Sequence, residues 1–393
     1  MHHNRGLPAG LRQPPFVLLC VSILLGALAP NMFLVVPPYL RNLGLDEARI
    51  GSMAGAFSLA SMLCLSPWAR AVERFGGRGP MAVGMLFCAT GSLAFEWSKS
   101  LAELLLARAV QGVGWSAVLV CYSFIATDLM PAERMAQALG VSGAFPLIAM
   151  ALGPAIGELI AAHSSFQWLF RVAALVAVLG AGLALRLPRG SRLHRSQESS
   201  GFRAWRPGIR RVLSAMFLVV TGFGATVAFL ADHAALRGIR SVSPFFTAYV
   251  VATVIARATC GSLSDRVGRH PVLVPSLAGQ AAALVGLAFL SRGWQLWATG
   301  LLFGFTHGLY YPALIVSIVE RGPSELRARA VASGYFAFAL GMSMSSLGNG
   351  VIARHMGYRA AFLLVAILVL ISSAMIAAEW RGQRDGIKEA GSA

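Results

Sequence analysis

Long apolar runs alternate with short polar gaps along the whole chain. The first run begins after a Pro14-Pro15 break and extends from Phe16 to Tyr39. At about 1.5 Å per residue, a helix of this length spans a hydrocarbon core about 30 Å thick. Eleven further runs follow the same pattern. We therefore predict twelve membrane-spanning helices, at 16–39, 50–69, 80–97, 101–127, 135–161, 165–186, 212–235, 244–264, 271–290, 294–319, 330–353 and 357–379.

The composition supports a membrane protein over a soluble one. Hydrophobic residues make up 56% of the chain and charged residues only 12%, against about 25% charged residues in a typical soluble domain. The net charge of +17 would fit a nucleic-acid-binding protein. The basic residues lie in the gaps between apolar runs, however, so we expect lipid around the helices and no nucleic-acid partner.

Successive gaps between the predicted spans lie alternately on the two sides of the membrane and so form two sets. Basic residues are distributed unequally between these sets. The set that includes both termini holds 22 Lys and Arg residues, and the opposite set holds 8. Because cytoplasmic loops carry the excess of Lys and Arg, both termini are predicted to be cytoplasmic. The longest gap, Pro188 to Arg211, is polar and rich in Arg. We interpret it as a cytoplasmic linker between two bundles of six helices, 1–187 and 212–393.

An internal repeat relates the two halves. The turn GSLSDRVGRH at 261–270 has a weaker copy, ARAVERFGGR, at 69–78. Aligning Glu73 with Asp265 sets an offset of 192 residues. The same offset carries Gly112 onto Gly304 and Phe57 onto Tyr249, although these landmarks lie outside the motif. Parallel repeats of this kind are typical of transporters.

The 261–270 turn closely resembles the signature loop of the major facilitator superfamily. That resemblance implies an all-α membrane transporter in which two six-helix bundles rock about a central site, and in which this loop latches one conformation. The alternative is a tight polar turn that only adds positive charge on the cytoplasmic side. The first copy has lost its leading glycine and one basic residue, so its latch is expected to be weaker. The predicted gating residues are Gly261, Asp265, Arg266, Gly268, Arg269 and their acidic partner Glu320, with Glu73, Arg74 and Asp128 in the first half.

Two further motifs lie inside predicted spans. Arg108, Gln111 and Gly112 in the fourth span resemble the family's helix-4 motif, whose arginine is linked to proton transfer or substrate contact. An arginine at this depth is costly in lipid and should face a polar cavity or a partner.

The sequence LGPAIGE, which ends at Glu158, resembles part of a motif typical of proton-driven exporters. Packing of small residues between helices explains it nearly as well.

Single polar residues inside spans suggest a substrate site. In the family, helices 1, 4, 7 and 10 line the central cavity. His307 lies 13 residues into its span, about 20 Å deep and near the midplane, but a histidine bonded within the bundle is equally compatible with its position. The substrate-binding residues that we predict are Asn31, Arg108, Gln111, Trp115, His307, Tyr310 and Tyr311.

Proton coupling requires a group that titrates inside the cavity. Asp232 is our first candidate for proton exchange and Glu158 the second. Because Asp232 lies near the outer end of its span, the competing interpretation is that its carboxylate simply faces solvent at the mouth of the cavity.

The five cysteines lie within apolar runs and form no C-x-x-C pair, so neither a disulfide framework nor a zinc site is predicted. The sequence also shows no nucleotide-binding loop and no nucleophile–base arrangement, and we therefore expect no enzyme, no metal and no cofactor.

The predicted function is a proton-coupled exporter of small organic molecules, acting as a monomer in a bacterial inner membrane. A proton-coupled importer of a small organic anion is the alternative, and a receptor or scaffold that keeps the fold without transport is a third possibility.

Overall fold

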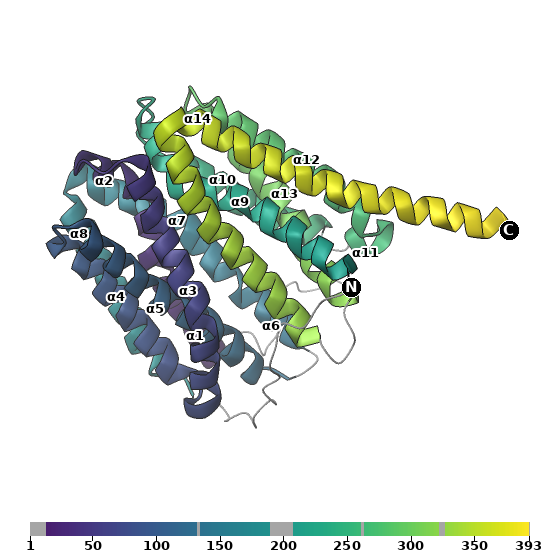
Figure 1. Cartoon of the computed structure of the whole chain (residues 1–393). Helices are drawn as coiled ribbons and strands as arrows, with labels where there is room; N and C mark the ends of the chain where they lie inside the picture. The colour runs from purple at the N-terminus through teal and green to yellow at the C-terminus, as the bar shows by residue number, and fades with distance from the viewer. Residues whose placement is uncertain (1–12, 132–133, 189–206, 261–262, 322–326, 393) are drawn as a thin grey trace, which may run out of the picture. The chain divides into compact units, whose positions relative to one another are not determined.

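The computed structural model describes residues 13–131, 134–188, 207–260, 263–321 and 327–392, and all regular structure in these ranges is helical (Figure 1). Gly261 of the predicted gating loop and most of the predicted linker lie outside the described residues. The helices of the first half are α1 (Pro14–Met32), the short 3₁₀ helix η2 (Phe33–Val35), α2 (Pro37–Asn42), α3 (Glu47–Phe75), α4 (Arg78–Trp97), α5 (Leu101–Asp128), α6 (Met135–Ser142), α7 (Ala144–His163) and α8 (Phe166–Ala184).

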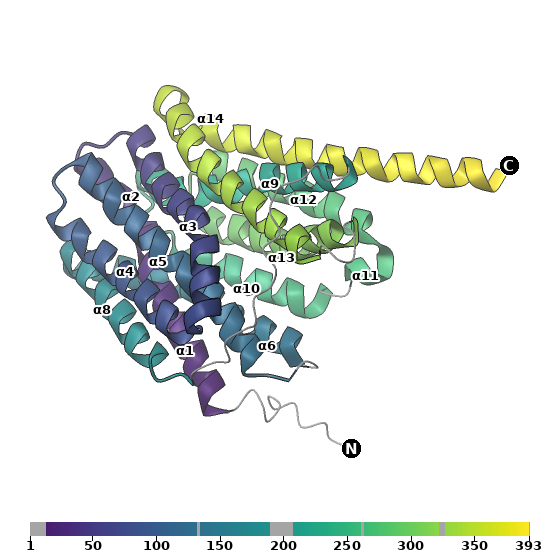
Figure 2. The same cartoon turned by 60° about the horizontal axis from the view of Figure 1, so that its bottom comes forward.

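The second half is built from six labelled elements. One of them, α14, contains a sharp bend at Gly357 (φ +81°, ψ 164°), where two helices meet. Figure 2 shows the two arms of α14 meeting at this bend. The elements are α9 (Pro207–Ala235), α10 (Ser243–Cys260), α11 (Leu263–Val267), α12 (Arg269–Ala288), α13 (Trp294–Arg321) and α14 (Arg327–Ser392).

The described helices account for the twelve predicted spans. Ten stretches are long and apolar enough to cross a membrane, and one of them, 332–382, contains both arms of α14. The helix α4, of 20 residues, lies at the predicted span 80–97 but is not one of these ten stretches. The predicted all-α fold is therefore confirmed, and only the limits of some spans change.

The clearest change of limits concerns the first predicted span, 16–39. The helix α1 ends at Met32, and the separate α2 begins at Pro37. A proline inside a helix lacks the N–H donor and clashes with the carbonyl four residues earlier, so Pro37 is suited to begin a helix. The predicted span 135–161 is likewise divided into α6 and α7, with Gly143 between them.

The chain forms two compact units. Unit 1 consists of residues 1–34 and 56–199, and unit 2 of residues 35–55 and 200–393. The segment 35–55, which contains α2 and the beginning of α3, precedes most of unit 1 in the sequence, yet it packs in unit 2. The predicted division into six-helix bundles at 1–187 and 212–393, joined by a linker, stays a prediction.

The internal repeat recurs in the packing of each unit. In unit 1, a Cβ added at Gly112 would lie 2.2 Å from the backbone oxygen of Phe57. In unit 2, a Cβ added at Gly304 would lie 2.1 Å from the backbone oxygen of Tyr249. Both glycines therefore permit the same close helix crossing, at positions that the 192-residue offset relates.

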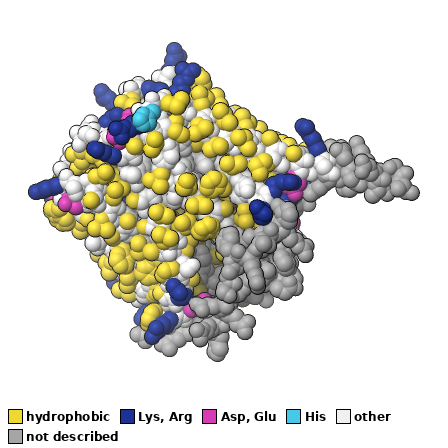
Figure 3. All heavy atoms as spheres, in the orientation of Figure 1, with side chains coloured by type: hydrophobic (Ala, Val, Ile, Leu, Met, Phe, Trp, Pro, Cys, Tyr) yellow, Lys and Arg dark blue, Asp and Glu magenta, His cyan; other side chains and the backbone are white. Residues whose placement is uncertain are grey.

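The surface of the helices is largely apolar. Leu63, Leu106 and Leu159 are each more than half exposed, and Figure 3 shows hydrophobic side chains covering much of the visible surface with few charged groups among them. Water would leave this surface unfavourably exposed, whereas lipid covers it without cost.

Candidate functional site

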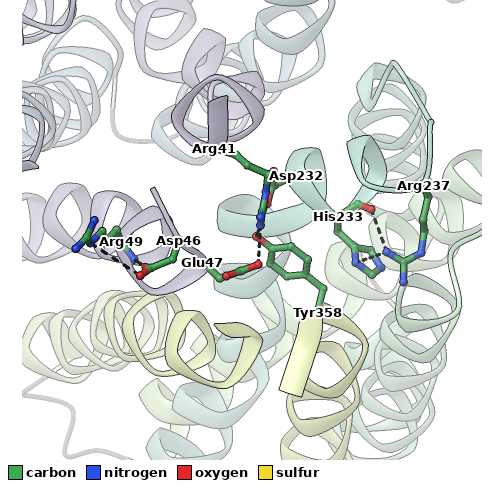
Figure 4. A network of polar contacts seen from close by, with 8 residues as sticks. All are labelled: Arg41, Asp46, Glu47, Arg49, Asp232, His233, Arg237 and Tyr358. Carbon is green, nitrogen blue, oxygen red and sulfur yellow. Dashed lines mark hydrogen bonds and ion pairs between the residues drawn. The ribbon is translucent and has the colours of Figure 1, made fainter. Parts of the chain in front are cut away.

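A network of polar side chains in unit 2 is centred on Asp232, a fully buried residue on α9. Arg41 of α2 donates from Nε to both carboxylate oxygens at 2.9 Å, and from Nη2 to Oδ2 at 2.6 Å. The hydroxyl of Tyr358, on α14, also donates to Oδ2 (Figure 4). Charge-assisted bonds of this kind are roughly twice as strong as neutral ones.

A second carboxylate contacts the same guanidinium. Arg41 Nη2 lies 2.7 Å from Glu47 Oε1, at the first residue of α3. The bonds to Asp232 raise the pKa of Arg41 most, against the opposing effect of burial, and the bond to Glu47 adds to the increase. Arg41 is therefore positively charged at any cellular pH. Close by, Arg354 pairs with Asp46 at 3.2 Å, with a side chain that is half exposed.

The sequence points to Asp232 as an ionisable residue in a span that lines the cavity in the family, but it does not point to the partners of Asp232. The side chain of Asp232 has no solvent contact in this structure, and its role in proton exchange stays a prediction. Arg41 lies 191 residues away in the sequence. No local pattern indicates such a contact, and nothing in the sequence marks Tyr358 as the third member.

His233, next to Asp232 on α9, belongs to a different set of contacts. Its Nε2 lies 2.9 Å from the backbone oxygen of Leu287, and Arg237 Nη1 lies 2.9 Å from its Nδ1. Because arginine is always a donor, Nδ1 accepts and Nε2 carries the proton. His233 thereby ties α9 to α12 behind the Asp232 carboxylate.

In unit 1, Arg108 lies half-buried on α5 among aromatic rings. Its guanidinium carbon is 4.7 Å from the ring centre of Phe57 and 5.2 Å from that of Phe33. Nη1 donates to Gln111 Oε1 at 2.6 Å, and Gln111 Nε2 donates in turn to Ser92 Oγ on α4 at 2.9 Å. Ser92 and Gln111 therefore orient the guanidinium.

No acidic side chain within the described ranges forms an ion pair with Arg108. The nearest acid along α5 is Glu103, which instead completes a capping box with Ser100 at the start of the helix. A cation inside a membrane protein normally pairs with an anion or faces a polar cavity. Arg108 thus provides a positive charge that an anionic ligand could neutralise.

His307, on α13, lies in an aromatic cluster of unit 2. Its Nδ1 is 2.9 Å from the hydroxyl of Tyr249 on α10, and its ring stacks on Tyr310 with centres 5.2 Å apart. Tyr311 and Phe223 approach it edge-on. His307 therefore contacts Tyr310 and Tyr311, which were predicted with it, and Tyr249, which was not; their role in substrate binding stays a prediction. The buried hydroxyl of Tyr310 has no hydrogen-bond partner within the described residues.

The other predicted cavity residues have simpler surroundings in unit 1. Asn31 Nδ2 donates to the backbone of its own helix at Ala27. A Cβ added at Gly153 of α7 would lie 2.7 Å from Asn31 Cβ, so the small residues of this motif serve helix packing. Trp115 is partly buried and packs against the apolar core. Glu158 lies half-buried on α7, and its role in coupling stays a prediction.

The predicted gating residues occupy helix ends. Arg269 Nη2 lies 2.8 Å from Glu320 Oε1, which is the pairing expected between the loop and the end of α13. Gly268 precedes α12 with φ +91°, a conformation that other residues rarely adopt. Arg266 and Asp265 belong to α11. Their role in gating stays a prediction.

The first copy of the gate is arranged differently. Glu73 lies near the C-terminal end of α3, and Asp128 is the last residue of α5. The guanidinium carbon of Arg74 lies 5.3 Å from the ring centre of Phe75. The predicted pairing of Arg74 with Asp128 stays a prediction.

Two relatives match the chain over most of its length. An uncharacterised MFS-type transporter of Salmonella typhimurium is 24% identical, with 87% of this chain and 90% of the relative covered. The multidrug resistance protein MdtG of Enterobacter lignolyticus is 22% identical, with 86% and 85% covered.

Two solved structures share the fold. The nucleoside transporter NupG, solved as a point mutant, superposes with a TM-score of 0.80 at 11% identity, with 93% of this chain and 99% of the transporter covered. The human organic anion transporter MFSD10 superposes with a TM-score of 0.67 at 18% identity, with 94% and 100% covered.

A family model described as Major Facilitator Superfamily matches residues 17–245 and 214–390, and so covers nearly the whole chain. The family consists of membrane transporters. The chain belongs to the Major Facilitator Superfamily and is an integral membrane transporter, not an enzyme.

Proposed function

We propose that this chain exports a small organic molecule across a bacterial inner membrane in exchange for protons. The observation that carries the proposal is the Asp232 carboxylate, fully buried on α9 and paired with Arg41. A proton-coupled transporter needs a group that alternates between charged and neutral forms inside the protein. The outward direction is inferred from MdtG, a relative that is named as a multidrug resistance protein.

Arg108 favours a second candidate, a transporter whose substrate is an organic anion. Its guanidinium has two aromatic neighbours and no acidic partner within the described residues. A substrate carboxylate would supply the missing charge, and an attached apolar group would fit beside Phe33 and Phe57. The structural similarity to a human organic anion transporter supports this candidate.

Inverted membrane vesicles provide the test. We expect uptake of a compound from a panel of cationic, neutral and carboxylate-bearing probes when the vesicle interior is acid, and loss of that uptake when the pH gradient is collapsed. Vesicles that contain Asp232→Asn serve as the matched control. Uptake that ignores the pH gradient would refute proton exchange, and uptake only in right-side-out vesicles would favour import.

A further inference from the structure

Two exposed arginines at one end of unit 2 have no acidic partner. Arg237 follows the C-terminal end of α9, and Arg359 lies two residues after the bend of α14 at Gly357. Neither residue forms an ion pair within the described ranges. The nearby Arg354 differs, because Asp46 balances its charge at 3.2 Å. Arg237 and Arg359 therefore retain two positive charges that a ligand could neutralise.

Arg237 is fixed in place by His233, one helical turn earlier. Its Nη1 donates to Nδ1 of His233 at 2.9 Å and to the backbone oxygen of His233 at 3.1 Å (Figure 4). His233 is fully buried, and its Nε2 donates in turn to the backbone oxygen of Leu287, near the end of α12. The Nε and Nη2 groups of Arg237 have no hydrogen-bond partner among the described residues. The guanidinium is thus held from the protein interior, while two of its three nitrogens stay available.

Arg359 is positioned at the same corner by an aromatic ring. Its guanidinium carbon lies 4.0 Å from the ring centre of Phe289, the C-cap residue of α12. Phe289 is two residues after Leu287, to which His233 is bonded. A ring attracts a cation through its π electrons and leaves the N–H donors unused, and these donors have no acceptor in the described part of the chain. The end of α12 therefore brings two incompletely bonded guanidiniums together.

The two guanidiniums are close enough to repel each other. Burial lowers the pKa of Arg237 most, and the positive charge of Arg359 lowers it further. Neighbouring like charges disfavour their charged forms, and an anion placed between them replaces one repulsion with two attractions. Arginine is suited to a phosphate group, because its planar fork donates two parallel N–H bonds to two oxygens. The geometry and the charge at this corner both favour a phosphate-bearing ligand.

The surface beside the arginines is apolar and aromatic. Phe289 is nearly half exposed, and Leu236, next to Arg237 in the chain, is more than half exposed. Trp294 and Trp297, in the first turn of α13, are exposed as well. Exposed tryptophans are enriched at the boundary between the hydrocarbon core and water, where the headgroups of phospholipids lie. A phosphate that carries hydrocarbon chains therefore fits this surface better than a free phosphate ion does.

We propose that Arg237 and Arg359 form a binding site for the phosphate of an anionic phospholipid. The phosphate oxygens accept hydrogen bonds from both guanidiniums, and an acyl chain lies against Phe289 and the exposed face of α12. A zwitterionic headgroup binds less well, because its ammonium group is repelled by the two arginines. The bound lipid joins the ends of α9 and α12 to the part of α14 that follows the bend.

Binding of a single lipid to the full-length protein in detergent tests the site and requires no transport. Native mass spectrometry gives the apparent Kd for phosphatidylglycerol and for phosphatidylcholine with the same acyl chains. In the parent we expect phosphatidylglycerol to bind about tenfold more tightly, the scale of one charged hydrogen bond. Arg237→Gln and Arg359→Gln should each remove most of this preference, and Arg359→Lys should retain part of it. The matched control is Arg354→Gln, which should keep the preference because Asp46 already balances that arginine.

Melting temperatures in lipid-free detergent show which variants are folded. If Arg237→Gln does not fold because it also loses the bonds to His233, Phe289→Leu provides a second variant. It keeps both charges, removes the ring beside Arg359, and should weaken phosphatidylglycerol binding by a smaller factor.

Three results would overturn the proposal. They are equal affinities of the parent for the two lipids, an unchanged preference in Arg359→Gln, and a loss in Arg354→Gln as large as that in Arg359→Gln. Inorganic phosphate alone is the further probe. If it raised the melting temperature of the parent as much as phosphatidylglycerol does, and not that of Arg359→Gln, the arginines would bind a free anion and the lipid would be refuted.

Discussion

Arg41 and Arg108 differ in what neutralises them. Arg41 has two carboxylates within 2.9 Å, whereas Arg108 has a glutamine and two phenylalanine rings. A cation held by neutral groups retains most of its field for a ligand, because a hydrogen-bonded amide compensates less charge than a carboxylate does. We therefore propose that Arg108 recognises the substrate, whereas the bonds of Arg41 hold α2 against α9.

Substitution of Arg108 should distinguish anionic from neutral substrates. We expect Arg108→Gln to raise the KM of a carboxylate-bearing probe by about tenfold or more, the scale of one charged hydrogen bond, and to leave that of its neutral ester nearly unchanged. Arg108→Lys keeps the charge and should recover part of the difference. Initial rates in inverted vesicles measure both probes. Equal losses for acid and ester would show that Arg108 has a structural role.

Asp232→Asn tests coupling separately from substrate movement. The amide cannot carry a proton through the cycle, so accumulation driven by a pH gradient should be lost. Substrate counterflow should remain measurable, because it requires no net movement of protons. The comparison is made on the same vesicles, with protein amounts matched by fluorescence. Normal pH-driven accumulation would remove Asp232 from the mechanism and leave Glu158 as the next candidate.

At the scale of helices, the internal repeat predicts that substitution of two equivalent glycines has the same effect on stability. Gly112→Ala and Gly304→Ala each place a Cβ about 2 Å from a backbone oxygen, and backbone cannot yield as a flexible side chain does. Both should lower the melting temperature of the protein in detergent by several degrees, for a loss of about 1–3 kcal/mol. Gly348→Ala on α14, with open space around its Cβ, is the control. Equal melting temperatures for all three would contradict the crossing geometry.

The limits of a helix were predictable from the sequence where the ends of an apolar run determine them. They were less predictable where a change of backbone direction within such a run ends one helix and begins another. Runs such as 294–319 became helices with nearly the expected limits, since α13 covers Trp294–Arg321. The separate α2 was missed because its residues continue the apolar run of α1 up to Tyr39. The pairing of Arg269 with Glu320 was found because the family motif and the helix end were both visible in the sequence.

At the scale of the whole molecule, the sequence repeat and the packing disagree over one segment. The repeat assigns 35–55 to the first half, whereas the compact units place it with residues 200–393. Hydropathy and periodicity carry no information about this placement. It depends on two ion pairs between residues far apart in the sequence, Arg41 with Asp232 and Asp46 with Arg354, and on the glycines at 51 and 350, which permit a close backbone contact.

A chain divided within the linker should reveal this placement. We expect co-expressed fragments 1–199 and 200–393 to purify together on a tag attached to the second fragment, because the first carries segment 35–55 of unit 2. Arg41→Gln in the first fragment should reduce the recovery of the pair by about tenfold, since it removes bonds that cross from one fragment to the other and leaves Asp232 buried without its counter-ion.

The control for the divided chain is Arg171→Gln. Arg171 pairs with Glu96, and both residues lie within unit 1 and within the first fragment. Its loss should therefore leave recovery of the pair unchanged, because no bond between the fragments is removed. If Arg171→Gln reduced recovery as much as Arg41→Gln does, the effect would reflect general destabilisation of the first fragment. Only a selective effect of Arg41 shows that α2 and the start of α3 belong with the helices of unit 2, where the Asp232 carboxylate holds them.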